Sequence, residues 1–432
     1  MSEWRVAPLR EIADIRVSNV DKKSTPGEAP VRLCNYMDVY ANDYIRADLP
    51  FMEATATAAE IQRFAVQQGD VMITKDSETP DDIGIPAVVT DQIEGLVCGY
   101  HLARIRPNRA LVDPVYLAKQ LALPEAAAYF AQRAAGSTRY GLSNRTIAEV
   151  PIRLAPLGQQ LCIAEILAQI DGAIERTEVL IEKHQQIKVG LMHDLFTRGA
   201  LLNGRRRKSF AEAPDLYQET ALGPLPREWR PSTVGESFAI DSGITLGPHR
   251  RPVRRSRKYL RVANVHREQL RLDDVASIEA LPGDEGYALE EGDLLVVEGH
   301  ANPAEIGRCA MVNQDAAGML FQNHLFRLRV NGIDKSFALL WLNSFHVQRY
   351  WERTCSTSSG LHTINRRMLK AVPLYVPSEA EQTRIVSAAA SARAVLDGHV
   401  KMAAKLRAHN RGVMQDLLTG KVRVPLAETA SA

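Results

Sequence analysis

Two long stretches of the chain carry hydrophobic residues at alternating steps of four and three, the spacing typical of a coiled-coil seam. The seam positions are Ile163, Leu167, Ile170, Ile174, Ile181, Leu191 and Leu195 in the first stretch, and Ile385, Leu396, Leu406, Val413 and Leu417 in the second. Thr177, His184 and Lys188 interrupt the first seam, and the second is rich in alanine. Because the seams recur in matching register, we predict two helices that pair with each other. Burial in an ordinary helical core is the alternative.

Proline, glycine and capping residues mark the ends of both predicted helices. The first begins after Pro156, and a Ser-Glu-Ala-Glu capping box follows Pro377 at the start of the second. Gly199 and Gly420 supply the stops. Each helix is therefore about 40 residues long, which corresponds to roughly 60 Å.

The rest of the sequence alternates short runs of β-forming residues with Gly, Pro and Asn. Strands are predicted at 70–74, 87–90, 101–105, 293–297, 309–312 and 324–328, and helical patterns appear at 114–133 and 335–353. This alternation predicts α+β domains built around a curved, mostly antiparallel sheet.

The chain is an internal duplication, because many local motifs recur in the same order about 222 residues later. The pairs include Gly69-Asp70 with Gly292-Asp293, His101-Leu102 with His324-Leu325, and Val150-Pro151 with Val372-Pro373. We predict a first globular domain at 1–155, a helix at 156–199, a linker at 200–222, a second globular domain at 223–376, a helix at 377–421 and a tail at 422–432. The fold class is α+β, with two similar domains joined by two long helices.

Polar loops occupy matching places in the two copies. The candidate DNA-binding residues are Lys75, Ser77, Thr79, Ser137, Thr138, Arg139 and Tyr140 in the first copy, and His300, Asn302, Thr357 and Ser358 in the second. Hydroxyl side chains and glycines let a backbone approach DNA and bond phosphates or base edges. For any single residue, a surface turn held by its own side chains is the alternative.

An arginine-rich run extends from His249 to Lys258 and contains no acidic residue. Its candidate DNA-binding residues are Arg250, Arg251, Arg254 and Arg255, since arginine suits bidentate contact with phosphate or guanine. A solvated charged loop is the alternative. His101 and His324 lie inside strand patterns, so we expect them to be core histidines.

Motifs of catalysis and metal binding are missing from the sequence. It has no phosphate-binding glycine loop, no Asn-Pro-Pro-aromatic motif and no histidine pair at metal-ligand spacing. The five cysteines are scattered, as expected of reduced thiols. With a net charge of +2, no signal sequence and no long apolar stretch, we expect a cytoplasmic protein without a catalytic centre.

The starts and ends of the two helices resemble those of type I restriction–modification specificity subunits. The segments Pro156-Leu157-Gly158-Gln159-Gln160 and Pro377 to Gln382, each followed by Ile163 or Ile385, are similar to that family's Pro-Leu-x-Glu-Gln-x-x-Ile helix start. The segments 194–199 and 416–421 are similar to its Leu-Leu-Thr-Gly-Lys stop. Gln159 departs from the family's pattern, which has Glu there.

The resemblance implies two target-recognition domains that each read half of a split DNA site. It also implies an antiparallel pair of spacer helices, on which two modification (methyltransferase) subunits dock and which restriction subunits then join. No cofactor is expected on this chain, because S-adenosylmethionine, Mg and ATP belong to the partner subunits. The alternatives are a single-chain restriction or modification enzyme and a coiled-coil adaptor without a DNA role.

Overall fold

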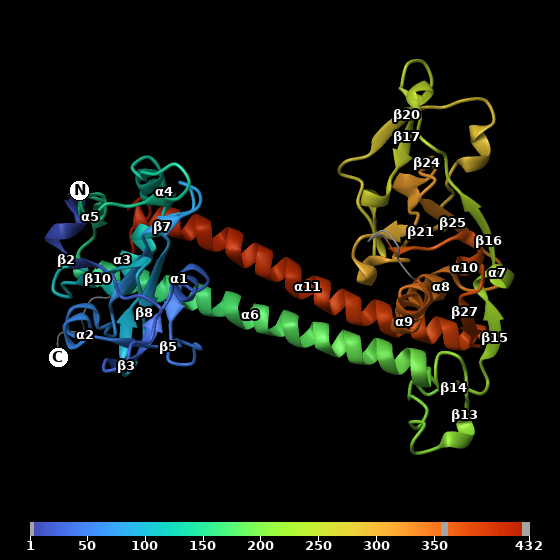
Figure 1. Cartoon of the computed structure of the whole chain (residues 1–432), viewed down its shortest axis with the longest axis horizontal. Coiled ribbons are helices and arrows are strands. Elements are labelled where there is room, and N and C mark those ends of the chain that lie inside the picture. The colour runs from blue at the N-terminus through green and yellow to red at the C-terminus, as the bar shows by residue number, and fades with distance from the viewer. Residues whose placement is uncertain (1–3, 356–361, 426–432) are drawn as a thin grey trace. The chain divides into compact units, whose positions relative to one another are not determined.

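The computed structural model describes residues 4–355 and 362–425. The chain divides into two compact units, one formed by residues 1–179 and 400–432 and the other by residues 180–399. Each unit contains one globular domain and one part of each of the two long helices (Figure 1).

The long helices are α6 (Leu157–Arg198) and α11 (Glu379–Leu418). In the first unit, the Asn410 side-chain amide donates to the Asp171 carboxylate at 2.8 Å, and Arg407 pairs with Glu178. Later residues of α6 therefore contact earlier residues of α11, so the two helices are antiparallel. Gly199 and Gly420 follow the helices with φ of 66° and 75°, the left-handed conformation that ends a helix.

The predicted seam residues are buried or half-buried along both helices. Ile163, Leu167, Leu195, Ile385 and Leu417 are buried, and Ile170, Ile174, Ile181, Leu191, Leu396, Leu406 and Val413 are half-buried. The buried seam residues also pack in the core of a globular domain. Leu167 belongs to the core of the first domain and Ile385 to the core of the second. Hydrophobic packing thus continues from each helix end into the domain beside it.

The first domain contains a five-stranded sheet and a three-stranded sheet. The larger has the order β2 (Ala13–Val17), β10 (Leu102–Pro107), β6 (Val71–Thr74), β8 (Pro86–Val89), β4 (Tyr44–Ile45), and the smaller has the order β5 (Met52–Ala56), β3 (Ala29–Cys34), β9 (Leu96–Cys98). Two strand pairs are β1 (Arg5–Pro8) with β12 (Pro151–Leu154) and β7 (Asp76–Ser77) with β11 (Tyr140–Gly141). The helices are α1 (Tyr36–Tyr40), α2 (Ala58–Phe64), α3 (Pro114–Leu121), α4 (Pro124–Ala131) and α5 (Asn144–Ala148).

The second domain repeats this topology, except that its larger sheet has no strand in the place of β4 among the described residues. Its larger sheet has the order β16 (Phe238–Ser242), β25 (Leu325–Val330), β21 (Leu294–Val297), β23 (Cys309–Met311), and its smaller sheet β20 (Ala276–Glu279), β17 (Ser256–Leu260), β24 (Leu320–Phe321). The strand pairs are β15 (Arg230–Thr233) with β27 (Pro373–Val376), β22 (Gly299–His300) with β26 (His362–Thr363), β18 (Val265–His266) with β19 (Gln269–Leu270), and β13 (Tyr217–Gln218) with β14 (Leu225–Pro226). The helices are α7 (Val234–Ser237), α8 (Lys335–Leu342), α9 (Phe345–Thr354) and α10 (Arg366–Lys370).

Strands β6 and β21 are buried at every position because both faces of the larger sheet are covered in each domain. In β6, Val71 and Ile73 face one core cluster, whereas Met72 faces another. The helical pattern at 114–133 forms two helices, since extended Leu123 interrupts it and Pro124 begins the next helix. The pattern at 335–353 is divided in the same way at Ser344, whose backbone is extended.

Candidate nucleic-acid interface

The structure brings the two polar loops of the first domain together. Strand β7 pairs with β11, so that Tyr140 lies opposite Ser77. The Leu142 N–H donates to the Lys75 carbonyl at 2.8 Å, and the Lys75 N–H donates to the His101 carbonyl at 3.0 Å. Residues distant in the sequence thereby form one continuous polar surface.

The candidate residues on this surface differ in exposure. Thr79, Ser137, Thr138 and Arg139 are exposed, Lys75 and Tyr140 are half-buried, and Ser77 is buried. The Lys75 ammonium lies 4.5 Å from the centre of the Tyr100 ring, a cation–π distance. The Ser77 hydroxyl accepts the Thr79 N–H at 3.4 Å, so Ser77 holds the turn of the loop.

The second domain contains the same frame of backbone contacts. Strand β22 pairs with β26, so that His300 lies opposite His362. The Ile364 N–H donates to the Glu298 carbonyl at 2.7 Å, and the Glu298 N–H donates to the His324 carbonyl at 3.0 Å. Asn302 is exposed and His300 half-buried. Two further candidates, Thr357 and Ser358, lie outside the described residues.

The expectation that His101 and His324 are core histidines is wrong. His101 Nδ1 lies 2.7 Å from the Asp76 carboxylate, and its side chain is 25% exposed. His324 Nδ1 lies 2.6 Å from the Glu298 carboxylate, and its side chain is 57% exposed. Strands β10 and β25 begin one residue after these histidines, so the side chains sit at the strand ends beside the polar loops. The recurrence of His101-Leu102 as His324-Leu325 was a sequence signal for the two histidines, whereas their acids lie 25 and 26 residues earlier in the chain.

The arginine-rich run has acidic partners that local sequence does not reveal. Arg250 forms an ion pair with Asp284, and both side chains are largely buried. The Glu279 carboxylate accepts the backbone N–H groups of Val253, Arg254 and Arg255 at 2.6 to 2.9 Å. Burial alone would raise the pKa of Asp284, but hydrogen bonds from Arg250 and the Leu281 N–H hold it below its usual range. Arg250 therefore anchors the loop.

The other three candidate arginines of the run, Arg251, Arg254 and Arg255, are exposed. They precede β17, which lies with β20 on the side of the second domain remote from α8 and α10 (Figure 1). Strand β17 and the β22–β26 pair belong to different sheets.

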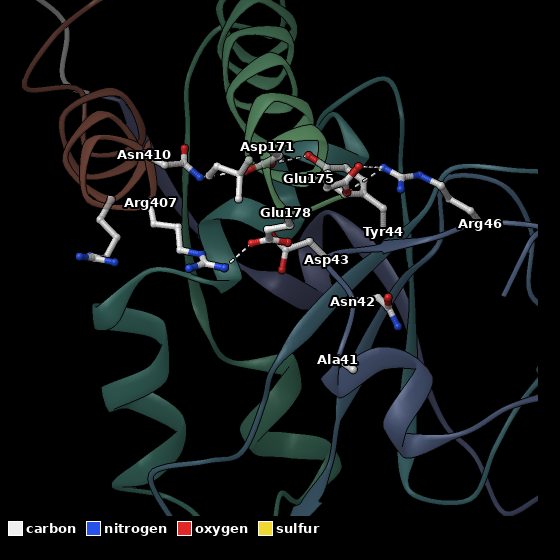
Figure 2. Close-up of a pocket in the computed structure, with 12 residues that line it drawn as sticks. Ala41, Asn42, Asp43, Tyr44, Arg46, Asp171, Glu175, Glu178, Arg407 and Asn410 are labelled. Atoms are coloured by element: carbon white, nitrogen blue, oxygen red, sulfur yellow. Dashed lines mark hydrogen bonds and ion pairs between the residues drawn. The ribbon is translucent and has the colours of Figure 1, made fainter. Parts of the chain in front are cut away.

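A buried polar cluster attaches the first domain to the long helices. The Tyr44 hydroxyl donates to Asp171 at 2.6 Å, and the Lys119 ammonium lies 2.8 Å from Asp171 and 2.7 Å from Asp43. Asn410 and Tyr44 reach Asp171 from opposite sides (Figure 2). Burial alone would lower the pKa of Lys119, but the two carboxylates outweigh it and raise that pKa. The cluster borders a cavity of about 420 Å³.

A different cluster attaches the second domain. Arg393 of α11 and Lys188 of α6 approach the Glu268 carboxylate at 3.2 and 3.9 Å. Within the described ranges, no group of three His, Cys, Asp or Glu side chains is placed to hold a metal ion. The same residues include no helix that is long and apolar enough to span a membrane.

The chain is a duplicated protein: two matched α+β domains with the same frame of polar loops are attached to an antiparallel helix pair. The family described as type I restriction modification DNA specificity domain matches residues 1–183 and 226–389. The chain therefore belongs to the type I restriction–modification DNA specificity family.

Curated relatives are similar to the chain at low identity. The type I restriction enzyme MjaVIII specificity subunit of Methanocaldococcus jannaschii is 21% identical over 405 residues, which cover 90% of this chain and 87% of that protein. The MjaX specificity subunit of the same organism is 23% identical over 54% of this chain and 52% of its own length. The StySPI specificity subunit of Salmonella potsdam is 23% identical over 68% of this chain and 60% of its own length. Two of these three alignments thus span less than two thirds of the relative.

Solved structures share the fold. The S subunit of a type I restriction–modification system from M. genitalium has a TM-score of 0.53 and 15% identity, covering 96% of each chain. A chain from a study of complex assembly and conformational transition of the type I R-M system has a TM-score of 0.58 and 16% identity, covering 98% of this chain and 99% of that one.

Proposed function

We propose that this chain is the non-catalytic, DNA-reading subunit of a type I restriction–modification complex and that its two domains read the two halves of a bipartite site. The observation that carries the proposal is the repeated frame of polar loops, in which position 75 or 298 links a histidine to a second loop. Two related surfaces on one chain suit two separate DNA segments, since each surface can contact its own bases and phosphates.

The long helices support a spacer role. The α6–α11 pair has a hydrophobic seam in each unit, interrupted at Thr177, His184 and Lys188, and its ends are built into the domain cores. A helix pair of this kind sets a distance that depends on its number of turns. Antiparallel pairing also agrees with two domains that follow each other along one chain.

The exposed faces of the helices support docking of modification subunits. Val179, Leu180, Ile187 and Val189 of α6 are large apolar side chains that are exposed. Exposed apolar side chains grouped along one element favour a protein interface. In this proposal the modification subunits bring S-adenosylmethionine chemistry, restriction subunits bring Mg and ATP, and this chain binds no cofactor of its own.

The test is co-expression with the cognate modification subunit, followed by mapping of methylated bases. We expect two defined half-sites separated by unspecified bases, centred about one helical turn apart. The chain alone should transfer no methyl group from S-adenosylmethionine. Methyl transfer by the isolated chain, or a single uninterrupted site, would contradict the proposal.

The spacer can be lengthened without changing the domains. Seven residues inserted beside His184 and seven beside His399, whose rings stack at 4.9 Å, preserve the heptad seam and add roughly 10 Å. The unspecified gap should then grow by about three base pairs while both half-sites stay the same. The control inserts the same seven residues in the exposed turn at Asn203, which should leave the gap unchanged.

A further inference from the structure

We propose that two histidine–carboxylate pairs, His101 with Asp76 and His324 with Glu298, are the matched phosphate contacts of the two domains. In each pair the imidazole contacts a DNA phosphate, and the carboxylate is the positioning residue. This inference rests on the proposed function, because it assigns one contact within each DNA-reading surface.

Each histidine lies where the two polar loops of its domain meet. Its backbone carbonyl accepts the N–H of residue 75 or 298, and the carbonyl of that same residue accepts an N–H from the second loop, at Leu142 or Ile364. Residue 75 or 298 therefore links the histidine to the second loop in both domains.

The two domains build the pair by different routes. The residue equivalent to Lys75 in the backbone frame is Glu298, so the acid has moved by one position along the chain from Asp76. The longer glutamate side chain still reaches Nδ1 at 2.6 Å, compared with 2.7 Å for Asp76. Because the pair persists although its acid differs in type and position, the paired histidine is the shared feature of the two surfaces.

The pairing leaves Nε2 as the atom available to DNA. Nδ1 faces the carboxylate in both domains, and the described residues provide no hydrogen bond to either Nε2. In the proposed contact the ring carries two protons, one shared with the carboxylate at Nδ1 and one at Nε2 that donates a charge-assisted hydrogen bond to a phosphate oxygen. A carboxylate without its histidine would instead repel the DNA backbone.

Other charged groups face these histidines. In the first domain, Arg139 Nη2 lies 3.4 Å from His101 Nδ1, and Lys75 lies over the adjacent Tyr100 ring. In the second domain, His300 and His362 lie opposite each other in the β22–β26 pair, which follows Glu298 along the chain. Arg139 and Lys75 bring positive charge to the surface around His101, which suits a phosphate.

The experiment measures binding of the complex with its modification subunit to a duplex carrying the mapped site, from pH 6 to 8.5 at constant ionic strength. A protonated histidine contact makes affinity fall as the pH rises, by up to about tenfold per pH unit for each proton taken up. His101→Ala or His324→Ala should weaken binding at pH 6 by about tenfold and reduce the salt dependence by about one ion. Neither should change the methylated sequence, because a phosphate contact carries no base information.

Conservative variants separate this contact from a structural role. His101→Arg keeps a permanent cation, so it should retain affinity and lose the pH dependence of that contact. Asp76→Asn removes the carboxylate that positions the imidazole, so it should weaken binding in the same direction as His101→Ala but by a smaller factor. His409→Ala, at an exposed position of α11, is the matched control and should leave the pH profile unchanged.

Each outcome decides between the inference and the proposed function. A wild-type complex that methylates no specific site would overturn the proposed function and the inference with it. A site-specific complex whose affinity and pH profile do not change in His101→Ala and His324→Ala overturns the inference alone. A variant that relaxes one base of a half-site would show a base contact and would also overturn the phosphate assignment.

Discussion

The two domains attach to the helix pair through equivalent positions of opposite charge. In the first unit, the helices supply an acid, Asp171, with Asn410 beside it, and the domain supplies the cation Lys119. The positions 222 residues away are Arg393 and Lys188, and in the second unit these cations meet an acid from the domain. The duplication has thus kept the place of attachment and reversed its charges.

Because of this charge reversal, each domain is complementary in charge to the helix segments of its own unit. Lys119 would face Arg393 if the first domain were placed on the second unit's helices, and a buried cation against a cation is strongly unfavourable. Glu268 would likewise face Asp171. Complementary charges therefore specify which domain each pair of helix segments accepts, although the two domains share a topology.

The two attachments also differ in burial. The side chains of Lys119 and Asp171 are 5% and 8% exposed, whereas Arg393 is 41% exposed. Buried charges cost much when a partner is lost, and exposed ion pairs contribute little. The first attachment should therefore be the more sensitive to substitution.

The largest effect is expected for Asp171→Ala. This change leaves Lys119 buried with only Asp43, which is mostly exposed, and removes the acceptor of Tyr44 and Asn410. We expect a loss of about 3–5 kcal/mol in the free energy of unfolding, measured with urea. The control is Glu175→Ala, whose ion pair with Arg46 is exposed on both sides and should cost less than about 1 kcal/mol. Equal effects of the two variants would contradict the difference in burial.

A second contrast concerns the C-terminal turns of the helices. In the first unit, the Gln120 amide donates to the Leu418 carbonyl of α11 at 2.7 Å. In the second unit, the equivalent carbonyl, Phe196 of α6, accepts from His346 Nε2 at 3.1 Å. Burial lowers the pKa of His346 to about 4, so this imidazole is neutral at pH 7. Only the second unit therefore contains a titratable group at this contact.

Acid should consequently destabilise the second unit through His346. Its folded pKa lies below the unfolded value of about 6.5, so the unfolded state binds the proton first as the pH falls. Stability is then lost between about pH 6.5 and 4, by up to about 3 kcal/mol. His346→Gln keeps a donor without a charge and should remove this loss in unfolding measurements at pH 7 and 5. An unchanged pH dependence in the variant would assign the acid sensitivity to other groups.

The helices and the duplication could be predicted from sequence because they depend on local, periodic patterns. Helix α6 begins at Leu157 because Pro156 stands before it and a heptad pattern follows. The antiparallel direction came from the family resemblance, since two heptad seams alone allow either direction.

Long-range pairing of charges could not be predicted in this way. The pattern showed Lys188 only as an interruption of the seam. In the structure its ammonium approaches the carboxylate of Glu268, which lies in a turn 80 residues later in the chain. The partner of Arg250 is Asp284, which a count of charges within the loop does not include. Such contacts depend on which segments the fold brings together, and local periodicity does not predict that arrangement.

The smallest effect is expected for Glu268→Gln. This residue has a φ of 60°, so the variant keeps the left-handed backbone and removes only the charge that Arg393 and Lys188 approach. Because these cations are partly exposed, we expect the free energy of unfolding, measured with urea, to fall by about 0.5–1 kcal/mol at low salt. The decrease should be smaller at 1 M salt, where screening is strong. Glu268→Gly is the matched control, since glycine adopts a positive φ freely and relief of backbone strain should offset the lost ion pair. A loss in Glu268→Gln as large as in Asp171→Ala, and independent of salt, would show that the second attachment depends on its charge as strongly as the first.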